Sequence, residues 1–210
     1  MEHQGILVVV SGFSGAGKGT LMKALLKKYD NYALSISATT RKPRDGEMDG
    51  REYFFKTVEE FEKLIDDDAL IEYAKYVDNY YGTPKEYVEN QLAAGKDVIL
   101  EIEIQGALKV KAKRPDTVLI FVTPPSAEEL KKRLIGRGTE TMDVIKSRLR
   151  RANEEAKGMN GYDYVLINDD LDKCVDELHS IILGEHSAAV RNETFIRKIT
   201  SELKGIMKGE

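Results

Sequence analysis

The sequence contains very little cysteine: Cys174 is the only one in its 210 residues. A single cysteine excludes an internal disulfide framework and a metal site built from several thiolates. Cys174 has apolar and charged neighbours in a helical pattern, so we interpret it as a buried structural thiol. The sequence also lacks an apolar run near the ~20 residues that span a bilayer, and residues 1–5 lack the basic region of a signal peptide. We therefore expect a soluble, cytoplasmic protein.

Positive charge is in slight deficit. Lys and Arg number 32 against 36 Asp and Glu, which gives a formal net charge of −4. General binding to DNA, RNA or an anionic membrane depends on summed positive charge, so the composition argues against these partners. With 41% hydrophobic residues, the chain can form one compact domain with a substantial core but not two large domains.

Apolar runs and helical stripes alternate along the chain. Residues 5–10 are apolar and rich in valine, as expected for a strand buried on both faces, and residues 20–29 have a helical apolar stripe. Further strands are predicted at 53–55, 98–104, 117–122 and 163–168, and further helices at 171–183 and, in an amphipathic tail, at 186–203. This alternation predicts an α/β fold with a doubly wound parallel sheet.

Three predicted helix starts have a Ser or Thr three residues before a Glu, which is the spacing of a capping box. The pairs are Thr57 with Glu60, Thr83 with Glu86, and Ser126 with Glu129. Pro84 would then occupy the first helical position of the second of these helices.

A glycine-rich segment joins the first strand to the first helix and satisfies the G-x-x-x-x-G-K pattern of a phosphate-binding loop. It reads Gly12, Phe13, Ser14, Gly15, Ala16, Gly17 and Lys18. This spacing lets successive backbone N–H groups wrap a phosphate, and the helix that follows points its positive dipole end at the same anion. Gly19 stands where Ser or Thr is usual, and Thr20 follows one residue later. The alternative is a plain glycine-rich turn, which the strand before the motif and the helix after it disfavour.

Further segments match, in chain order, those of one enzyme family. The matching segments are residues 37–44 (SATTRKPR), 46–47 (GE), 50–54 (GREYF), the single residue Phe61, and residues 71–72 (IE), 79–83 (NYYGT), 105–106 (QG), 123–126 (TPPS), 136–140 (GRGTE) and 168–170 (NDD). Together with the phosphate loop they resemble the guanylate kinases from about residue 6 to residue 183. The resemblance implies a P-loop NTPase-type core at 1–36, 84–127 and 160–185, a small mixed GMP-binding lobe at 37–83 and a helical lid at 128–159. The C-terminal helical extension at 186–210 lies outside it.

The residue types of the second block suit a nucleoside monophosphate. Arg41 and Arg44 could clamp a phosphate that carries up to two negative charges, and Tyr53 and Tyr81 offer it phenolic donors. A single carboxylate can accept both the N1–H and the amino group of guanine. The resemblance assigns that role to Glu72. It also implies three further residues that contact GMP and one further carboxylate. These are Ser37, Gly82 and Thr83, with Glu103 as the acid.

Each of these residues also has a structural interpretation. Thr83 could serve only as a helix cap, Arg41 and Arg44 could be surface arginines, Tyr81 could belong to the core, and Glu72 could lie on a solvated strand edge. Only their joint match favours the binding site.

Two glutamates end the predicted strand at 98–104. By resemblance Glu101 approaches Mg²⁺ through water and Glu103 faces GMP, although which carboxylate serves which side stays open. The family commonly carries Asp at one or both positions. Thr20 is a second candidate near the metal.

The basic stretch 131–157 resembles the lid that folds over ATP. Arg137 and Arg148 would contact phosphates, Arg133 lies in the same stretch, and Asn168 would lie near the adenine. The catalytic set is then Lys18, Arg41, Arg137 and Arg148, with Mg²⁺ arriving on ATP.

The resemblance thus implies transfer of a phosphoryl group from Mg-ATP to GMP. Two alternatives stay open: a kinase of the same fold for another monophosphate, and an inactive guanylate-kinase-like module that binds proteins. The chain would act as a monomer or as a homo-oligomer, in which the apolar stripe of the C-terminal helix is a candidate contact.

Overall fold

The computed structural model describes residues 4–76, 78–136, 138 and 141–208. The strands are β1 (Leu7–Gly12), β2 (Tyr32–Leu34), β3 (Ala38–Thr39), β4 (Phe54–Phe55), β5 (Leu70–Tyr76), β6 (Asn79–Pro84), β7 (Asp97–Glu101), β8 (Val118–Thr123) and β9 (Tyr164–Ile167). The α-helices are α1 (Lys18–Lys28), α2 (Val58–Asp66), α3 (Lys85–Ala93), α4 (Ile104–Lys113), α5 (Ala127–Gly136), α6 (Met142–Ala156), α7 (Leu171–His186) and α8 (Glu193–Lys208). Two 3-10 turns, η1 (Met159–Gly161) and η2 (Ala189–Asn192), complete the described elements.

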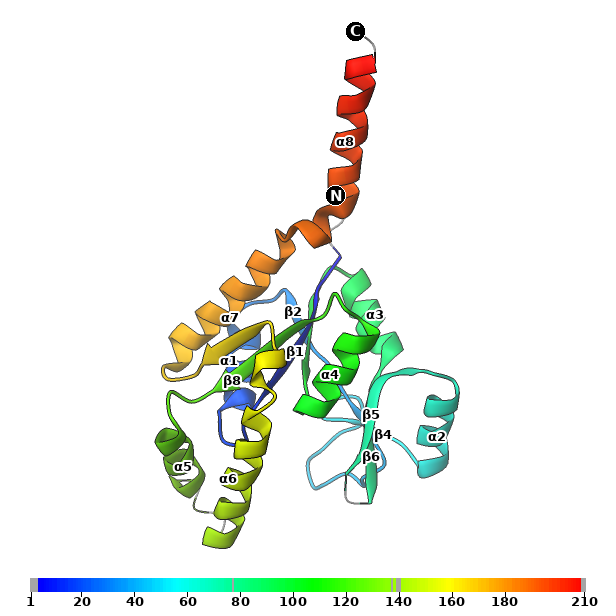
Figure 1. Cartoon of the computed structure of the whole chain (residues 1–210). Helices are drawn as coiled ribbons and strands as arrows, with labels where there is room; N and C mark the ends of the chain where they lie inside the picture. The colour runs from blue at the N-terminus through cyan, green and yellow to red at the C-terminus, as the bar shows by residue number, and fades with distance from the viewer. Residues whose placement is uncertain (1–3, 77, 137, 139–140, 209–210) are drawn as a thin grey trace.

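The larger sheet is parallel, with the strand order β2-β7-β1-β8-β9 (Figure 1). Its central strand β1 is buried on both faces, because Val8 and Val10 pack with α1, α6 and α7 while Leu7 and Val9 pack with α3 and α4. Continuous apolar strands with helices on both faces are the expected form of a parallel sheet. The predicted α/β fold is confirmed.

The smaller sheet has the order β4-β3-β6-β5 and mixes one parallel pair with antiparallel pairs. Helix α2 covers it with Phe61, which is fully buried with Ala38 and Leu70 and stacks on Tyr80 at a ring distance of 5.2 Å. The capping box predicted at Thr57 is confirmed, since its side chain accepts from the backbone of Glu60 and the Glu60 side chain accepts in return.

The second predicted capping box is wrong. Thr83 lies in β6, and its hydroxyl donates to the carboxylate of Glu72 instead of capping a helix. Helix α3 therefore begins at Lys85, with Pro84 as its N-cap residue. The third cap is confirmed, because Ser126 Oγ accepts from the backbone N–H of Glu129 at 3.1 Å. The strand predicted at 98–104 ends earlier than expected, at Glu101, and α4 begins at Ile104.

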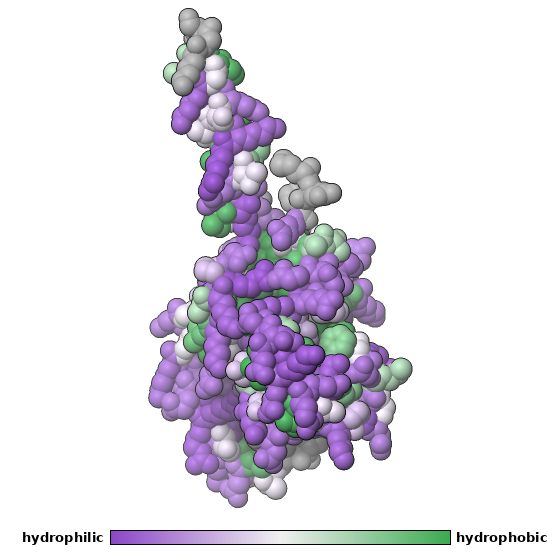
Figure 2. Space-filling view, turned by 90° about the vertical axis from the view of Figure 1, so that its right-hand side faces the viewer, coloured by the Kyte–Doolittle hydropathy of each residue, from purple (hydrophilic) through white to green (hydrophobic). Residues whose placement is uncertain are grey.

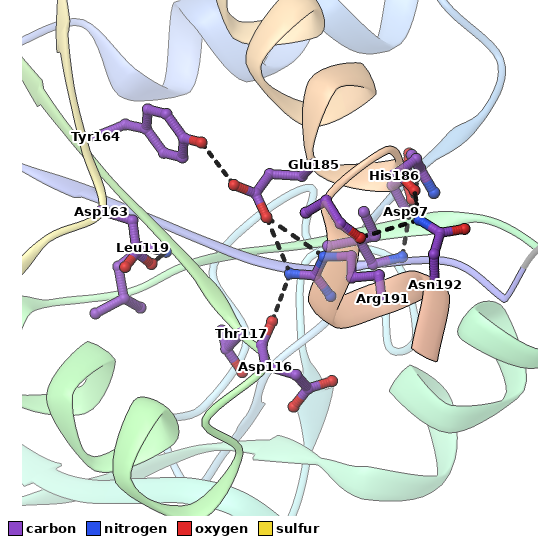
Figure 3. A network of polar contacts seen from close by, with 12 residues as sticks. Asp97, Asp116, Thr117, Leu119, Asp163, Tyr164, Glu185, His186, Arg191 and Asn192 are labelled. Carbon is purple, nitrogen blue, oxygen red and sulfur yellow. Dashed lines mark hydrogen bonds and ion pairs between the residues drawn. The ribbon is translucent and has the colours of Figure 1, made fainter. Parts of the chain in front are cut away.

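Polar contacts fix the base of the C-terminal extension to the core (Figure 3). Arg191 donates to the carbonyl of Asp116 at 2.6 Å and pairs with Glu185, which also accepts from the hydroxyl of Tyr164. His186 hydrogen-bonds the buried carboxylate of Asp97 at 2.9 Å. These contacts hold the end of α7 and the start of the extension in one geometry.

Beyond this base, α8 projects from the body of the molecule (Figures 1 and 2). Apolar side chains lie exposed along it, among them Phe195, Ile196, Ile199, Leu203 and Ile206. Among the residues that the structure describes, no helix combines the length and apolar character needed to cross a bilayer. Cys174 is buried in the core as predicted, and burial raises the pKa of its thiol to about 11.

Candidate active site

The phosphate loop occupies the turn from β1 to α1, at the C-terminal edge of the parallel sheet. Gly17 has a φ of +91°, and a Cβ atom there would lie 2.6 Å from Nδ2 of Asn168. Lys18 turns back over the loop, where its Nζ donates to the carbonyls of Gly12 at 2.7 Å and Phe13 at 3.2 Å. The loop therefore presents backbone N–H groups, a helix N-terminus and an ammonium group on one side.

Asn168 supports this loop from behind. Its buried side chain donates to the carbonyl of Ala16 at 2.8 Å, and its backbone N–H donates to Thr123 at 2.8 Å. The structure therefore places Asn168 against the phosphate loop, where its side-chain amide has a structural partner.

Helix α6 also contacts the loop. Arg148 donates from Nη1 to Ser14 Oγ at 2.5 Å, so a cation of the predicted lid reaches the phosphate loop. Arg133 lies in α5 and pairs with Glu129 one turn away. Arg137 lies outside the described residues.

A cavity of about 620 Å³ opens between the phosphate loop and α6. Its wall includes Ser14, Lys18 and Arg148 and, at the end of β7, Glu101 and Glu103. The surrounding protein desolvates the Glu101 carboxylate and raises its pKa, although the positive charge of Lys18 acts in the opposite direction. Thr20 is exposed in the first turn of α1.

A second cavity of about 300 Å³ lies beside the small sheet. It collects six of the residues expected to bind GMP, namely Ser37, Tyr53, Glu72, Tyr81, Gly82 and Glu103. Glu72 is only 8% exposed, and its Oε1 accepts from the hydroxyl of Thr83 at 2.8 Å. Burial raises the pKa of Glu72, although the hydrogen bond from Thr83 opposes this shift.

Arg41 does not line this second cavity itself but contacts Tyr53, which does. Its guanidinium lies over the ring of Tyr53, 5.3 Å from the centroid, and Tyr53 meets Tyr81 edge to face. Glu47 holds the arginine segment in place, because it pairs with Arg41 at 2.9 Å and accepts from the backbone N–H of Arg44 at 2.7 Å. These two hydrogen bonds lower the pKa of Glu47, so it stays ionised. The side chain of Arg44 is exposed.

The two cavities meet at the end of β7. Glu101, Ile102 and Glu103 line both of them, so a ligand in one cavity lies next to a ligand in the other. Both glutamates face both cavities, and the question of which one serves which side stays open.

This pairing of a phosphate loop with a second, carboxylate-containing cavity agrees with the sequence comparisons. The family profile described as guanylate kinase matches residues 4–185. The chain belongs to the guanylate kinase family. It is 52% identical over 202 residues to a guanylate kinase of Caldanaerobacter subterraneus, which covers 96% of this chain and 98% of that protein. It is 51% identical over 203 residues to one from Bacillus cereus, which covers 96% and 99%. The crystal structure of guanylate kinase from Anaplasma phagocytophilum superposes with a TM-score of 0.71 at 32% identity and covers 90% of both chains.

The donor atoms of this guanylate kinase suit Mg²⁺ that is carried by a nucleotide. Within the described residues, no group of three or more His, Cys, Asp or Glu side chains could hold a metal ion by itself. Mg²⁺ commonly keeps several waters and binds through one or two carboxylates together with phosphates. Glu101, at the wall of the loop cavity, fits that limited role.

Two residues of this site were missed by the sequence analysis as functional candidates. Glu47 holds the arginine segment, and Arg151 of α6 forms an ion pair with Glu103 at 2.6 Å. Glu47 belongs to a matched segment, three residues after Arg44, which was the available signal. Arg151 stood in a run of basic residues where nothing separated it from its neighbours.

Two alanine substitutions, one in the phosphate loop and one just after it, should differ in their effect on stability. Gly17→Ala puts a Cβ at positive φ and against Asn168, so it should lower the free energy of unfolding by roughly 1–3 kcal/mol. Gly19→Ala is the matched control: it lies in α1 with no atom within 4 Å of the new Cβ, and it should be neutral or raise stability by up to about 1 kcal/mol. Urea unfolding measures both, and equal effects would contradict the loop geometry.

Glu72→Gln should stabilise the protein at pH 7. The folded protein binds the Glu72 proton more tightly than the unfolded chain, so stability falls as pH rises through that raised pKa. Glutamine keeps the acceptor for Thr83 without a buried charge. The gain measured by urea unfolding should shrink as the pH falls below about 4, where the carboxyl becomes protonated in the unfolded chain as well as in the folded one. Glu62→Gln, on the exposed face of α2, is the control and should change little. A gain that is independent of pH would contradict this account.

Proposed function

We propose that this guanylate kinase transfers the γ-phosphoryl group of ATP to the phosphate of GMP and forms ADP and GDP. The observation that carries the proposal is the junction of two cavities at Glu101, Ile102 and Glu103, with Lys18 on one side and Glu72 on the other. Phosphoryl transfer requires mainly that two anions be aligned in line and that charge be neutralised between them.

The triphosphate would lie on the loop of residues 12–18, where backbone N–H groups wrap it. The ammonium group of Lys18 donates to the carbonyls of Gly12 and Phe13, so it already lies over the loop. In the complex it would exchange these two hydrogen bonds for hydrogen bonds to phosphate oxygens. Arg148 would move from Ser14 to the transferred group, and Arg137 would join it from the lid. Mg²⁺ bound with ATP would neutralise phosphate charge, and Glu101 would hold one of its waters.

GMP would occupy the smaller cavity. Its phosphate would meet Arg41, Arg44, Tyr53 and Tyr81, and its guanine would meet Glu72. The ionised carboxylate can accept the N1–H and the amino group together, which adenine cannot offer in that arrangement. Ser37, Gly82 and Thr83 would complete the contacts. No general base is needed, because the acceptor oxygen belongs to a phosphate that is already ionised at neutral pH.

The proposed substrate-binding lobe, lid and core correspond to separate ranges of the chain. Residues 37–83 would form the GMP-binding lobe and residues 128–159 the lid, while the rest of residues 1–185 would form the core. Closure of the lid would exclude water, which would otherwise accept the phosphoryl group. We place the enzyme in the cytoplasm.

Glu72→Gln tests the base assignment. The variant loses a charged acceptor for two donors of guanine, so the KM for GMP should rise about 10- to 100-fold while the KM for ATP stays nearly unchanged. A coupled assay with Mg-ATP and, in turn, GMP, AMP, CMP and UMP measures both the effect and the specificity. Glu62→Gln serves again as the control. Unchanged GMP kinetics in Glu72→Gln would refute the assignment.

The same assay, together with a measurement of phosphopeptide binding, separates the alternatives. Preference for another monophosphate would indicate a different kinase of this fold. Absence of turnover together with tight binding of a phosphopeptide would indicate an interaction module, which the retained Lys18, Arg41, Arg44, Arg137 and Arg148 disfavour.

For the C-terminal extension we propose self-association through α8. Ile196, Ile199, Leu203 and Ile206 follow the 3-4-3 spacing of a coiled-coil seam, and such a narrow seam is completed by another helix. The contacts of Arg191 and His186 hold α8 away from its own body, so a second copy of α8 is the matching partner.

Ile199→Glu should therefore convert the oligomer to a monomer, because it places a charge in the seam. Ser201→Glu introduces the same charge on the other face of α8 and should leave the assembly unchanged. Sedimentation velocity measures the state of each. A monomeric wild-type chain would contradict the proposal.

A further inference from the structure

Glu103 occupies a position that both substrates would share. It is the N-cap residue of α4, two residues after the end of β7, and it lines the loop cavity and the smaller cavity alike. A carboxylate on this common wall can respond to a ligand on either side.

The partner of Glu103 comes from the lid. Nη2 of Arg151 in α6 lies 2.6 Å from Oε2 of Glu103, while Nε of the same guanidinium donates to Glu155 Oε1 at 2.9 Å. Glu155 is the better buried of the two acids, at 19% side-chain exposure against 68% for Glu103. Glu155 therefore fixes the orientation of Arg151, and the other edge of the guanidinium points at Glu103.

Helix α6 contacts both halves of the site from one face. Arg148 reaches Ser14 of the phosphate loop, and Arg151, three residues later, reaches Glu103. Side chains three apart on a helix point in the same direction. A shift of α6 toward the donor nucleotide therefore also shifts the guanidinium that is paired with Glu103.

The Arg151–Glu103 ion pair is exposed, which indicates that it can open readily and that each partner can bind water or another group instead. Exposed ion pairs contribute little to stability, since water solvates both partners well when they separate. A role as a permanent structural brace is therefore disfavoured, and a role in which the contact responds to ligands fits better.

We propose that Arg151 is a positioning residue that couples occupancy of the GMP cavity to the lid through Glu103. GMP would fix Glu103 in its cavity wall, and the fixed carboxylate would hold Arg151 and with it α6 over the phosphate loop. Each nucleotide would then bind more tightly when the other is present, as linkage requires. The inference rests on the proposed function, because it takes GMP as the ligand of the smaller cavity.

The test compares the Kd of a non-hydrolysable ATP analogue with and without saturating GMP, measured by calorimetry in the presence of Mg²⁺. In the wild-type chain GMP should tighten this Kd roughly fivefold. In Arg151→Gln the ratio should fall to near one, while the Kd for the analogue alone changes less than about twofold. Arg151→Lys keeps the positive charge but lacks the planar guanidinium that bonds Glu155 and Glu103 at the same time, so it should give an intermediate ratio.

Arg150→Gln is the matched control, since it removes the same charge from the neighbouring, exposed position of α6, and it should keep the wild-type ratio. A wild-type ratio of one, or an Arg151→Gln variant with the wild-type ratio, would overturn the inference. If Arg151→Gln lowers the melting midpoint by several degrees, the test rests on Arg151→Lys instead. Its ratio of the analogue Kd without GMP to the Kd with GMP should then lie below the wild-type ratio, and a wild-type ratio in this variant would overturn the inference. Failure of the wild-type chain to phosphorylate GMP would instead overturn the proposed function.

Discussion

Repulsion between two phosphate anions is the constraint on which the rest of this site depends. Two nucleotides can react only if their phosphates meet, and positive charge must lie between and around them. In the proposed complex this charge would come from three separate segments: Lys18 after β1, Arg148 on α6 and Arg41 before β4. Strands β1 and β7 are parallel neighbours that end at one edge of the sheet, so the phosphate loop and the acidic end of β7 lie side by side although they are far apart in the sequence.

The same region concentrates carboxylates, which would ordinarily oppose anion binding. Burial raises the pKa of Glu72, and partial desolvation by the surrounding protein raises the pKa of Glu101. Glu47 and Glu103 are instead paired with arginines. In the proposed complex Glu72 and Glu101 would face the ligands, while Glu47 holds Arg41 in place and Glu103 pairs with Arg151.

Much of this arrangement was predictable from the sequence, since it follows local rules. The phosphate loop, the buried strands and the caps at Thr57 and Ser126 each depend on residues a few positions apart. The capping box predicted at Thr83 failed because of a distant partner: Thr83 has the spacing of a cap, but the carboxylate of Glu72, eleven positions away, takes its hydroxyl. The roles of Asn168 behind the loop and of Arg151 against Glu103 also required the third dimension, because each contact spans a large sequence separation.

A crystal structure with a bisubstrate ligand, in which adenosine and guanosine are joined through five phosphates, tests the central claim most directly. The account predicts that the adenosine-side phosphates lie on the loop around Lys18, that guanine contacts Glu72, and that the phosphate chain passes the end of β7 beside Glu101 and Glu103. A ligand held at the loop with its guanosine outside the cavity of Ser37, Glu72 and Tyr81 would contradict the account.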